Sequence, residues 1–303
     1  MRIALTGGTG FIGRYIIREL LNHGHTLRCW KRPTSHLGSL EGVAGIEWLS
    51  GDLTAPETMP LLVAECDAVV HAGISRSGKA FHGHEDDIPS YAAINVIGTL
   101  QLIEAAKETS CNRFVFLSSC AVHEIILDDM PLNESHPLWA TSHYGAHKAA
   151  IEKFIHSYGF GDQFPICALR PTGVYGLAEP ADRSKWFELV SDVIHGKEVS
   201  CSGGGKEVHA ADVARAVHLL LKAEATQITG QAFNVYDMYI SKYDVAFLAK
   251  EIAESDSKLA GTACRPKHQI DTTKIRKLGL TLPGESRLRE TITEMIDHAR
   301  KNG

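Results

Sequence analysis

The sequence predicts an α/β fold built on a doubly wound parallel sheet, with a smaller C-terminal lobe interleaved with it. From residue 2 to about residue 175, short apolar runs alternate with segments whose apolar residues recur at helical spacing. This alternation is typical of successive strand-helix units, which form parallel sheets covered by helices. A glycine-rich turn at residues 6–13 joins the first strand to the first helix, which is where such sheets hold ligands.

The glycine turn has the pattern G-x-x-G-x-x-G. It follows the apolar run 3–5 and opens a segment with apolar residues at 12, 16 and 20, the spacing of one helix face. Residues without a Cβ atom permit a tight turn and a close backbone approach to a pyrophosphate. The start of the helix offers free N–H groups and the positive end of its dipole. We therefore predict a dinucleotide site formed by Gly7, Gly10, Phe11, Ile12 and Gly13.

Length and composition describe an ordinary globular protein with a small-molecule partner. The chain has 303 residues, of which 22% are charged and 44% hydrophobic, and its formal net charge is −5. The negative charge gives no reason to expect nucleic acid or a membrane surface as the partner. No apolar run approaches the roughly 20 residues of a membrane-spanning helix, and the first strand begins too early to leave room for a leader. We therefore expect a cytoplasmic protein.

The cysteines and histidines predict neither disulfides nor a metal site. The 7 cysteines are scattered and contain no C-x-x-C pair, so we expect reduced thiols. His82 and His84 lie close in the sequence, and so do His143 and His147. Neither pair has an evident third ligand, whereas a protein zinc site uses at least three protein ligands.

The residues after the second predicted strand, 26–30, indicate the cofactor. An NAD site usually places Asp or Glu about 20 residues past the glycines, where it accepts hydrogen bonds from the adenosine ribose. Here the chain instead carries Lys31 and Arg32, followed by Thr34 and Ser35. Because a guanidinium fork suits the oxygens of a 2′-phosphate, we favour NADP, with NAD as the alternative. The competing interpretation is that both cations are simply solvated loop charges.

The remaining segments divide the chain into a cofactor domain and a substrate lobe. We expect the cofactor domain over residues 1–174 and about 206–238, and the substrate lobe over about 175–205 and 239–303. Further strands are expected at 46–49, 67–73, 114–117, 166–169 and 232–235, and helices at 91–109, 144–158, 186–195, from 212 onward, 241–252 and 288–299.

Tyr144 and Lys148 are the candidates for proton transfer. Positions i and i+4 of a helix lie on one face, roughly 5–6 Å apart at Cβ. A nearby ammonium favours the phenolate and lowers the pKa of a phenol from about 10 towards the working range. Tyr144 can then give or take a proton at a carbonyl or alcohol oxygen while a hydride moves to or from a nicotinamide. This pattern predicts an oxidoreductase.

Ser118 and Ser119 end the strand expected at 114–117, on the side of the sheet where the cofactor lies. A hydroxyl there can bond the reacting oxygen and orient it. We choose Ser119 over Ser118, with Cys120 as a third candidate. A covalent serine mechanism is less attractive, because no G-x-S-x-G elbow occurs anywhere in the chain.

Taken together, these motifs resemble the extended short-chain dehydrogenase/reductase family, which includes NAD-dependent epimerases/dehydratases and dihydroflavonol-reductase-like enzymes. The resemblance covers essentially the whole chain. The motifs that carry it are Gly7, Gly10 and Gly13; Asp52-Leu53; Asn95 with Gly98-Thr99; Ser118-Ser119; Tyr144 with Lys148; Arg170-Pro171 through Tyr175-Gly176; His209 through Asp212; and Gly230-Gln231 through Asn234-Val235.

The resemblance implies a Rossmann-like fold and an enzyme that interconverts a carbonyl and a secondary alcohol. It implies Ser119, Tyr144 and Lys148 as the catalytic set, with Lys148 also bonding the nicotinamide ribose. The cofactor contacts that it implies are Asp52 and Leu53 near the adenine, His71, Ala72 and Gly73 along the cofactor, and Pro171 and Thr172 beside the carboxamide. Because family members often pair through helices such as 91–109 and 143–158, a homodimer is one option.

Two departures from the family pattern limit the substrate assignment. After Ser-Ser the family usually continues to Val-Tyr-Gly, whereas here Val122, His123 and Glu124 follow. Many sugar-nucleotide epimerases carry an Arg that clamps the diphosphate, and residues 203–207 supply none. An epimerase or dehydratase of sugar nucleotides is therefore the first alternative function, and a non-catalytic cofactor-sensing protein the second. Candidate substrate contacts are His123, Arg183, Lys185, Trp186 and His209.

Overall fold

The computed structural model describes residues 1–75 and 87–302, and His82 and His84 lie outside these residues. The chain forms two compact units. Unit 1 comprises residues 1–171, 213–235 and 270–280, and unit 2 comprises residues 172–212, 236–269 and 281 to the C-terminus. Relative to the boundaries expected from the sequence, residues 172–174, 206–212 and 236–238 belong to unit 2 and residues 270–280 to unit 1.

Unit 1 is built on a parallel sheet in the order β10-β6-β5-β4-β1-β2-β3. The predicted doubly wound fold is confirmed. The strand order reverses between β1 and β4, and ligands of such sheets bind outside the carboxyl ends of the strands at that point. The strands are β1 (Arg2–Thr6), β2 (Thr26–Lys31), β3 (Ile46–Ser50), β4 (Ala68–His71), β5 (Phe114–Leu117), β6 (Ile166–Pro171) and β10 (Gln231–Val235).

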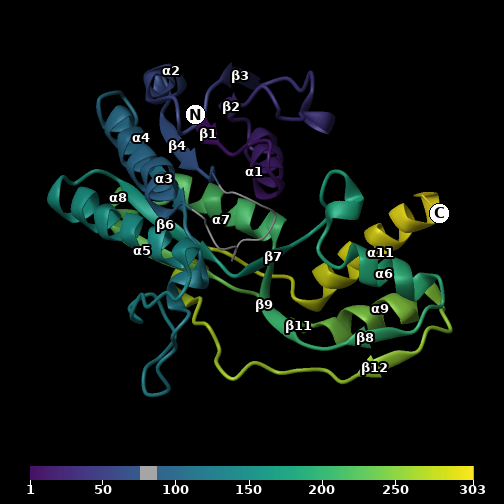
Figure 1. Ribbon diagram of the computed structural model, residues 1–303. Helices are drawn as coiled ribbons and strands as arrows, with labels where there is room; N and C mark the ends of the chain where they lie inside the picture. Colours follow the sequence, from purple (N-terminus) through teal and green to yellow (C-terminus); the bar gives the residue numbers. More distant parts are fainter. Residues whose placement is uncertain (76–86, 303) are drawn as a thin grey trace. The chain divides into compact units, whose positions relative to one another are not determined.

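The central strands are buried on both faces, because helices cover each face (Figure 1). Alternate side chains of a strand point to opposite faces. Ala4 and Val69 accordingly join the core beneath α2, α4 and α5. On the other face, α1 and α7 approach each other, with the rings of His23 and His218 stacked 3.8 Å apart. These helices are α1 (Phe11–Asn22), α2 (Met59–Val63), α4 (Gly98–Lys107), α5 (His143–His156) and α7 (Ala210–Lys222).

The single helix expected at 91–109 is divided into three parts. A short helix, α3 (Ile88–Ala92), begins at Asp87, whose side chain accepts a hydrogen bond from the Ser90 N–H. A π-helical turn, Ala93–Ile97, then leads into α4. Such turns are frequent at functional sites, and this one contains the buried Asn95. Two short helices, α8 (Ala225–Ile228) and α10 (Thr273–Lys277), complete unit 1.

Unit 2 combines two small sheets with three longer helices. Its sheets have the orders β11-β9-β7 and β12-β8, and its helices share one apolar core. The elements are β7 (Gly173–Tyr175), α6 (Phe187–Ile194), β8 (Val199–Cys201), β9 (Gly204–His209), β11 (Met238–Ser241), α9 (Lys242–Ala253), β12 (Leu259–Gly261) and α11 (Glu285–Asn302). Ser241 caps α9 through a capping box with Asp244.

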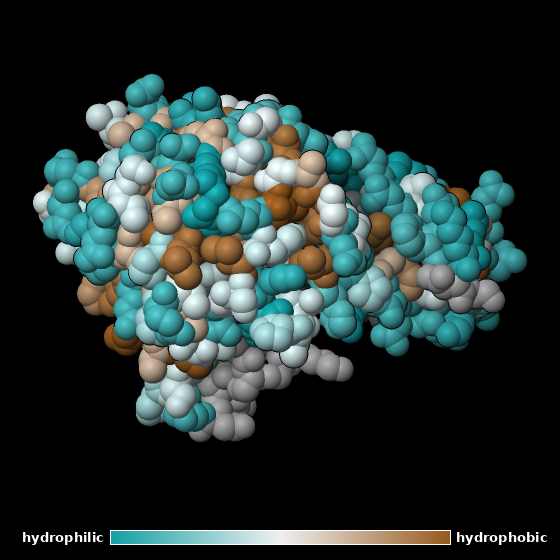
Figure 2. Space-filling model, turned by 90° about the horizontal axis from the view of Figure 1, so that it is seen from above, coloured by the Kyte–Doolittle hydropathy of each residue, from teal (hydrophilic) through white to brown (hydrophobic). Residues whose placement is uncertain are grey.

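Polar residues cover most of the face drawn in Figure 2, and its apolar residues form small patches. Within residues 1–75 and 87–302, no helix combines the length and apolar character that a bilayer crossing requires. All 7 cysteines are free thiols, and five of them are buried: Cys29, Cys66, Cys111, Cys167 and Cys201.

Candidate active site

The glycine turn has the geometry that a bound pyrophosphate requires. Gly7 adopts φ +73°, and the Gly10 N–H donates to the Gly7 carbonyl at 3.0 Å. A Cβ atom at Gly13 would lie 2.1 Å from that carbonyl oxygen, so the helix can approach the turn only because Gly13 has none. No side chain caps the first N–H groups of α1, where Phe11 and Ile12 lie. The backbone N–H groups at this helix start have no side-chain cap, which is the arrangement that suits a phosphate ligand.

A chain of buried hydrogen bonds joins this turn to the ends of β4 and α4. The Thr6 hydroxyl lies 2.6 Å from His71 Nδ1, and His71 Nε2 lies 2.9 Å from the Thr99 hydroxyl. Since Thr99 donates its proton to the Asn95 carbonyl, His71 must donate from Nε2 and accept at Nδ1. Thr6 also accepts the Gly73 N–H at 3.0 Å. His71 thus links the end of β1 to the first turn of α4.

Ala72 and Gly73, which are predicted to lie along the cofactor, lie against the glycine turn. A Cβ atom at Gly7 would approach the Ala72 carbonyl and the Gly73 nitrogen to 2.7 Å. The register pairs Thr6 with His71, so the ends of β1 and β4 lie side by side. The predicted cofactor residues of these two strands are therefore brought together in unit 1.

The loop after β2 carries the candidate phosphate ligands. Arg32 is exposed and Lys31 is half-buried. The Arg32 N–H donates to the Ser35 hydroxyl at 3.1 Å, which closes a tight turn. Sequence reasoning missed the anchor of this loop, Arg14 of α1, which donates to the carbonyls of residues 36 and 37 at 2.7 Å each. The fold thus fixes the backbone beside Arg32 and leaves its guanidinium exposed.

Asp52 and Leu53 have structural contacts in unit 1. The Asp52 carboxylate accepts hydrogen bonds from the Thr54 N–H and hydroxyl at 2.8 and 2.5 Å, and so caps a turn. The Leu53 side chain is only 8% exposed and belongs to the core. Gly98 packs against the Leu53 carbonyl, where a Cβ atom would come within 2.9 Å. Any contact of these residues with an adenine thus adds to a structural role.

Tyr144 and Lys148 lie one turn apart on α5, which begins at the cap residue Ser142. The Lys148 ammonium is 5.9 Å from the centre of the Tyr144 ring and donates to the Leu117 carbonyl at 2.7 Å. Lys148 is buried and Tyr144 is half-buried. Burial lowers the pKa of Lys148 to about 7, and the negative charge of Glu152 opposes that shift. The predicted pair therefore meets at the carboxyl end of β5.

The two serines after β5 have different surroundings. Ser118 is buried and donates its hydroxyl proton to Glu152 at 2.5 Å. Ser119 is half-buried and accepts the Ala121 N–H at 3.1 Å, so its own proton can go to a ligand oxygen. The Cys120 thiol lies 3.1 Å from the Arg170 carbonyl.

The turn at 122–124, which departs from the family pattern, makes structural contacts within unit 1. His123 is 4% exposed, and its two ring nitrogens lie 3.1 Å from Arg170 Nη1 and from the Pro137 carbonyl. Its side chain is therefore engaged within unit 1, and its contact with a substrate stays a prediction. The Glu124 carboxylate accepts from the backbone and hydroxyl groups of Thr141 and Ser142. Glu124 thereby anchors the start of α5, just ahead of Tyr144.

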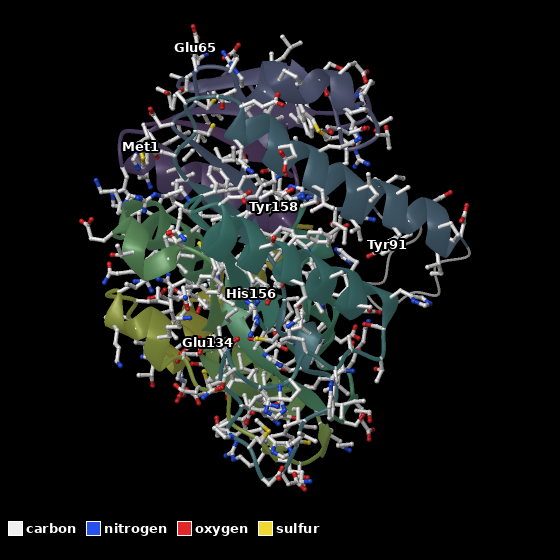
Figure 3. The ribbon with its side chains drawn as sticks, turned by 90° about the vertical axis from the view of Figure 1, so that its left-hand side faces the viewer. Met1, Glu65, Tyr91, Glu134, His156 and Tyr158 are labelled. Carbon is white, nitrogen blue, oxygen red and sulfur yellow. The ribbon has the colours of Figure 1, made fainter. Side chains whose placement is uncertain are left out.

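His147 has a partner of its own. Its Nδ1 atom lies 2.7 Å from the Tyr91 hydroxyl, and Tyr91 projects from α3 (Figure 3). Over residues 1–75 and 87–302, no three His, Cys, Asp or Glu side chains gather as a metal site would need.

The other predicted substrate contacts lie in unit 2. The Lys185 ammonium is 2.5 Å from the buried Glu207 carboxylate and 5.1 Å from the centre of the Trp186 ring. Ring contacts continue from Trp186 through Tyr175 to His209, with centres 5.3 and 5.1 Å apart. Arg183 lies on an exposed turn. Of the predicted carboxamide neighbours, Pro171 ends β6 in unit 1 and Thr172 begins unit 2.

A model of the NAD dependent epimerase/dehydratase family matches residues 3–235 of the chain. The chain belongs to this family. It is an NAD(P)-dependent extended short-chain dehydrogenase/reductase, as its glycine turn and its Tyr-Lys pair indicated. The family is confirmed, whereas the dihydroflavonol-reductase subtype receives no specific support.

Similar proteins of this family catalyse different reactions. A 3-beta-hydroxysteroid dehydrogenase from Mycolicibacterium neoaurum is 29% identical over 62% of this chain, which spans about half (52%) of that protein. A dTDP-D-glucose 4,6-dehydratase from Mus musculus is 25% identical over 96% of this chain and 87% of its own length. A farnesyl-dihydroquinoline-oxide ketoreductase from Stigmatella aurantiaca is 29% identical over 74% of this chain and 65% of its own length.

Solved structures of the family have the same fold. The UDP-glucose 4-epimerase of Thermotoga maritima, solved with UDP-glucose, has a TM-score of 0.80 over 100% of this chain and 99% of its own, at 21% identity. The UDP-glucose 4-epimerase of Thermus thermophilus, solved with NAD, has a TM-score of 0.77 over 99% of both chains, at 22% identity. At these identities the likeness is one of fold.

Proposed function

We propose that this enzyme is an NADP-preferring oxidoreductase that interconverts a carbonyl and a secondary alcohol on a small or medium-sized organic substrate. The supporting observation is the arrangement at the end of β5. There the buried Lys148 ammonium lies one helical turn from the half-buried Tyr144, and Ser119 keeps a hydroxyl proton for a ligand oxygen. A cation, a phenol and a hydroxyl are the groups that a carbonyl reduction needs around the reacting oxygen.

Each residue has a distinct role in the reduction. The carbonyl carbon would accept a hydride from the nicotinamide when the cofactor is bound. Ser119 donates a hydrogen bond to the carbonyl oxygen and orients it, and Tyr144 transfers its phenolic proton to the same oxygen. The positive charge of Lys148 stabilises the phenolate that this transfer leaves. The product is the secondary alcohol, and the reverse sequence oxidises it.

The preference for NADP rests on Arg32 and Lys31. Arg32 is exposed on a loop that Arg14 fixes from behind, and in the part of the chain after β2 no carboxylate stands where NAD enzymes usually have one. The same proposal includes adenine contacts from Asp52 and Leu53 and carboxamide contacts from Pro171 and Thr172. It also includes substrate contacts from Arg183, Lys185, Trp186 and His209.

A sugar-nucleotide dehydratase or epimerase is the second candidate. The match to the mouse dehydratase over 96% of this chain favours it. Residues 203–207 contain Lys206 but no Arg, which disfavours it, because a guanidinium can bind a diphosphate through two parallel hydrogen bonds and an ammonium cannot. The names of the dehydrogenase and ketoreductase relatives mention no nucleotide sugar. These two relatives therefore favour the reductase.

The balance of cofactor separates these candidates. We expect stoichiometric NADPH consumption, followed at the nicotinamide absorbance, when a panel of ketones and aldehydes is supplied. Conversion of a nucleotide sugar without net change in cofactor would instead establish the dehydratase or epimerase. Cofactor binding by calorimetry without turnover on either panel would favour the cofactor-sensing protein. The oligomeric state of the same preparation, measured by light scattering, tests the homodimer.

A further inference from the structure

The catalytic face of α5 continues one turn beyond Lys148. Tyr144, Lys148 and Glu152 occupy positions i, i+4 and i+8 of this helix, and such residues lie on one face. Glu152 is completely buried, with 0% of its surface exposed. Burying a carboxylate is costly unless hydrogen bonds or opposite charges compensate it, so its partners identify what it does.

Glu152 joins two strands that end at the site. It accepts the Ser118 hydroxyl at 2.5 Å, and Arg170 of β6 approaches both its oxygens, from Nε at 2.9 and 3.0 Å and from Nη2 at 2.5 Å. The remaining Arg170 nitrogen contacts His123 and the Glu134 carbonyl, each at 3.1 Å. Ser118 immediately precedes Ser119, so the carboxylate fixes the backbone that presents the proposed substrate-orienting hydroxyl.

The surroundings of Lys148 contain few compensating charges. The Lys148 ammonium lies near the Tyr144 ring of α5 and the Phe116 ring of β5, and it contacts the Leu117 carbonyl. His147 and Glu152 of α5 and His71 of β4 interact with it electrostatically. Burial lowers the pKa values of His71 and His147 to about 3 and about 2, so both rings are neutral at pH 7. Glu152 is the carboxylate that opposes the loss of the Lys148 proton.

We propose that Glu152 is a positioning residue of this site, which keeps Lys148 as an ammonium and holds the Ser118-Ser119 backbone against α5. This inference rests on the proposed function, because it assigns Glu152 to the machinery of Tyr144, Lys148 and Ser119. The proposed role of Glu152 differs from that of a merely structural ion-pair partner in one respect. A structural pair would matter for stability alone, whereas a positioning carboxylate also sets the charge of Lys148.

Two variants that break the same ion pair distinguish these roles. Glu152→Gln and Arg170→Gln each leave a buried charge without its partner, and both are expected to lower stability. They differ in their effect on Lys148, because the first removes the carboxylate that raises its pKa and the second leaves that carboxylate in place. The readout is the pKa of Lys148 in the cofactor-free enzyme, followed by NMR of isotope-labelled lysine, with Lys148→Arg used to assign the resonance.

We expect Glu152→Gln to lower the pKa of Lys148 by about one unit, which is the effect of removing one nearby opposite charge. Arg170→Gln should leave it unchanged or raise it. If Glu152→Gln does not fold, the double variant Glu152→Gln/Arg170→Gln leaves neither charge buried alone, and the proposal predicts that the pKa of Lys148 is about one unit lower there than in Arg170→Gln. An unchanged pKa without Glu152, or equal downward shifts in both single variants, would overturn the proposal.

The titration uses neither cofactor nor substrate, so its outcome does not depend on which reaction the enzyme catalyses. The pH profile of turnover provides the second readout. Its basic limb should move to lower pH in Glu152→Gln by the same amount as the Lys148 titration, and Glu152→Asp should restore it. If the enzyme reduces no carbonyl at all, the proposed function fails while the titration result still decides the role of Glu152.

Discussion

The Lys148 ammonium donates a hydrogen bond to the carbonyl oxygen of Leu117 at 2.7 Å. Leu117 is the last residue of β5, so this bond ties the middle of α5 to the carboxyl end of the central sheet. The cation therefore has a fixed place beside Ser118 and Ser119. Since it is also buried, its field acts on Tyr144 with little screening by solvent.

Arg32→Ala tests the cofactor preference. Charge-assisted bonds from a guanidinium to a phosphate are among the stronger polar contacts, so NADPH affinity should fall about tenfold or more, equivalent to about 1.4 kcal/mol or more. NADH affinity should change little. Fluorescence titration of both cofactors measures the difference, and Arg18→Ala, an exposed arginine of α1 that contacts Ser39, is the matched control. Equal losses for NADPH and NADH would refute the phosphate contact.

Gly13→Ala tests the close approach of α1 to the glycine turn. The added methyl group would meet the Gly7 carbonyl at 2.1 Å, and backbone at that distance cannot yield without moving the turn. We expect the free energy of unfolding to fall by about 1–3 kcal/mol and dinucleotide binding to be lost. Gly161→Ala is the control, because no neighbouring atom lies within 4 Å of its Cβ position. Wild-type cofactor affinity in Gly13→Ala would contradict the proposed phosphate site.

The buried histidines predict acid sensitivity. Burial, reinforced by Lys148, lowers the pKa of His71 to about 3, and burial, reinforced by Arg170, lowers that of His123 to about 4, both from 6.5. Below pH 6.5 the unfolded chain therefore binds protons that the folded chain does not. The free energy of unfolding should therefore be highest above pH 6.5 and should fall as the pH drops towards 4. The fall should reach up to about 1.4 kcal/mol per pH unit for each ring.

Urea unfolding at pH 7, 6 and 5 measures how steeply the free energy of unfolding falls with pH. His71→Gln should reduce this slope by the contribution of one ring, whereas His195→Gln, at an exposed position, should leave it unchanged. A free energy of unfolding that stays constant between pH 7 and 5 would show that the rings are not held neutral.

The sequence predicted the elements whose signal is local. The apolar run that forms β5 was bounded correctly at 114–117, and the Tyr144-Lys148 spacing placed both groups on one helix face. The strand β9 escaped prediction, because its glycines and charged residues have little strand propensity and pair only through β7 and β11. The π-helical turn within 91–109 likewise has no local sequence signal.

The site residues that sequence reasoning missed depend on tertiary pairing. Glu152 and Arg170 are 18 residues apart and meet only because α5 packs on β6. The sequence signal for this pair was a charged residue within each of the apolar segments that form α5 and β6. The contacts of His123 have no local signal for the same reason, since its partners come from β6 and from the loop at 137. The roles of Ser119, Tyr144 and Lys148 in catalysis stay predictions.

Turnover by Tyr144→Phe tests the central claim most directly. This substitution removes the phenolic proton and keeps the ring, so NADPH-dependent carbonyl reduction should fall by about 10²–10⁴-fold. Cofactor affinity, measured by fluorescence titration of the same preparation, should stay within about twofold of wild type, a difference below about 0.5 kcal/mol. Undiminished turnover in Tyr144→Phe would show that another group supplies the proton.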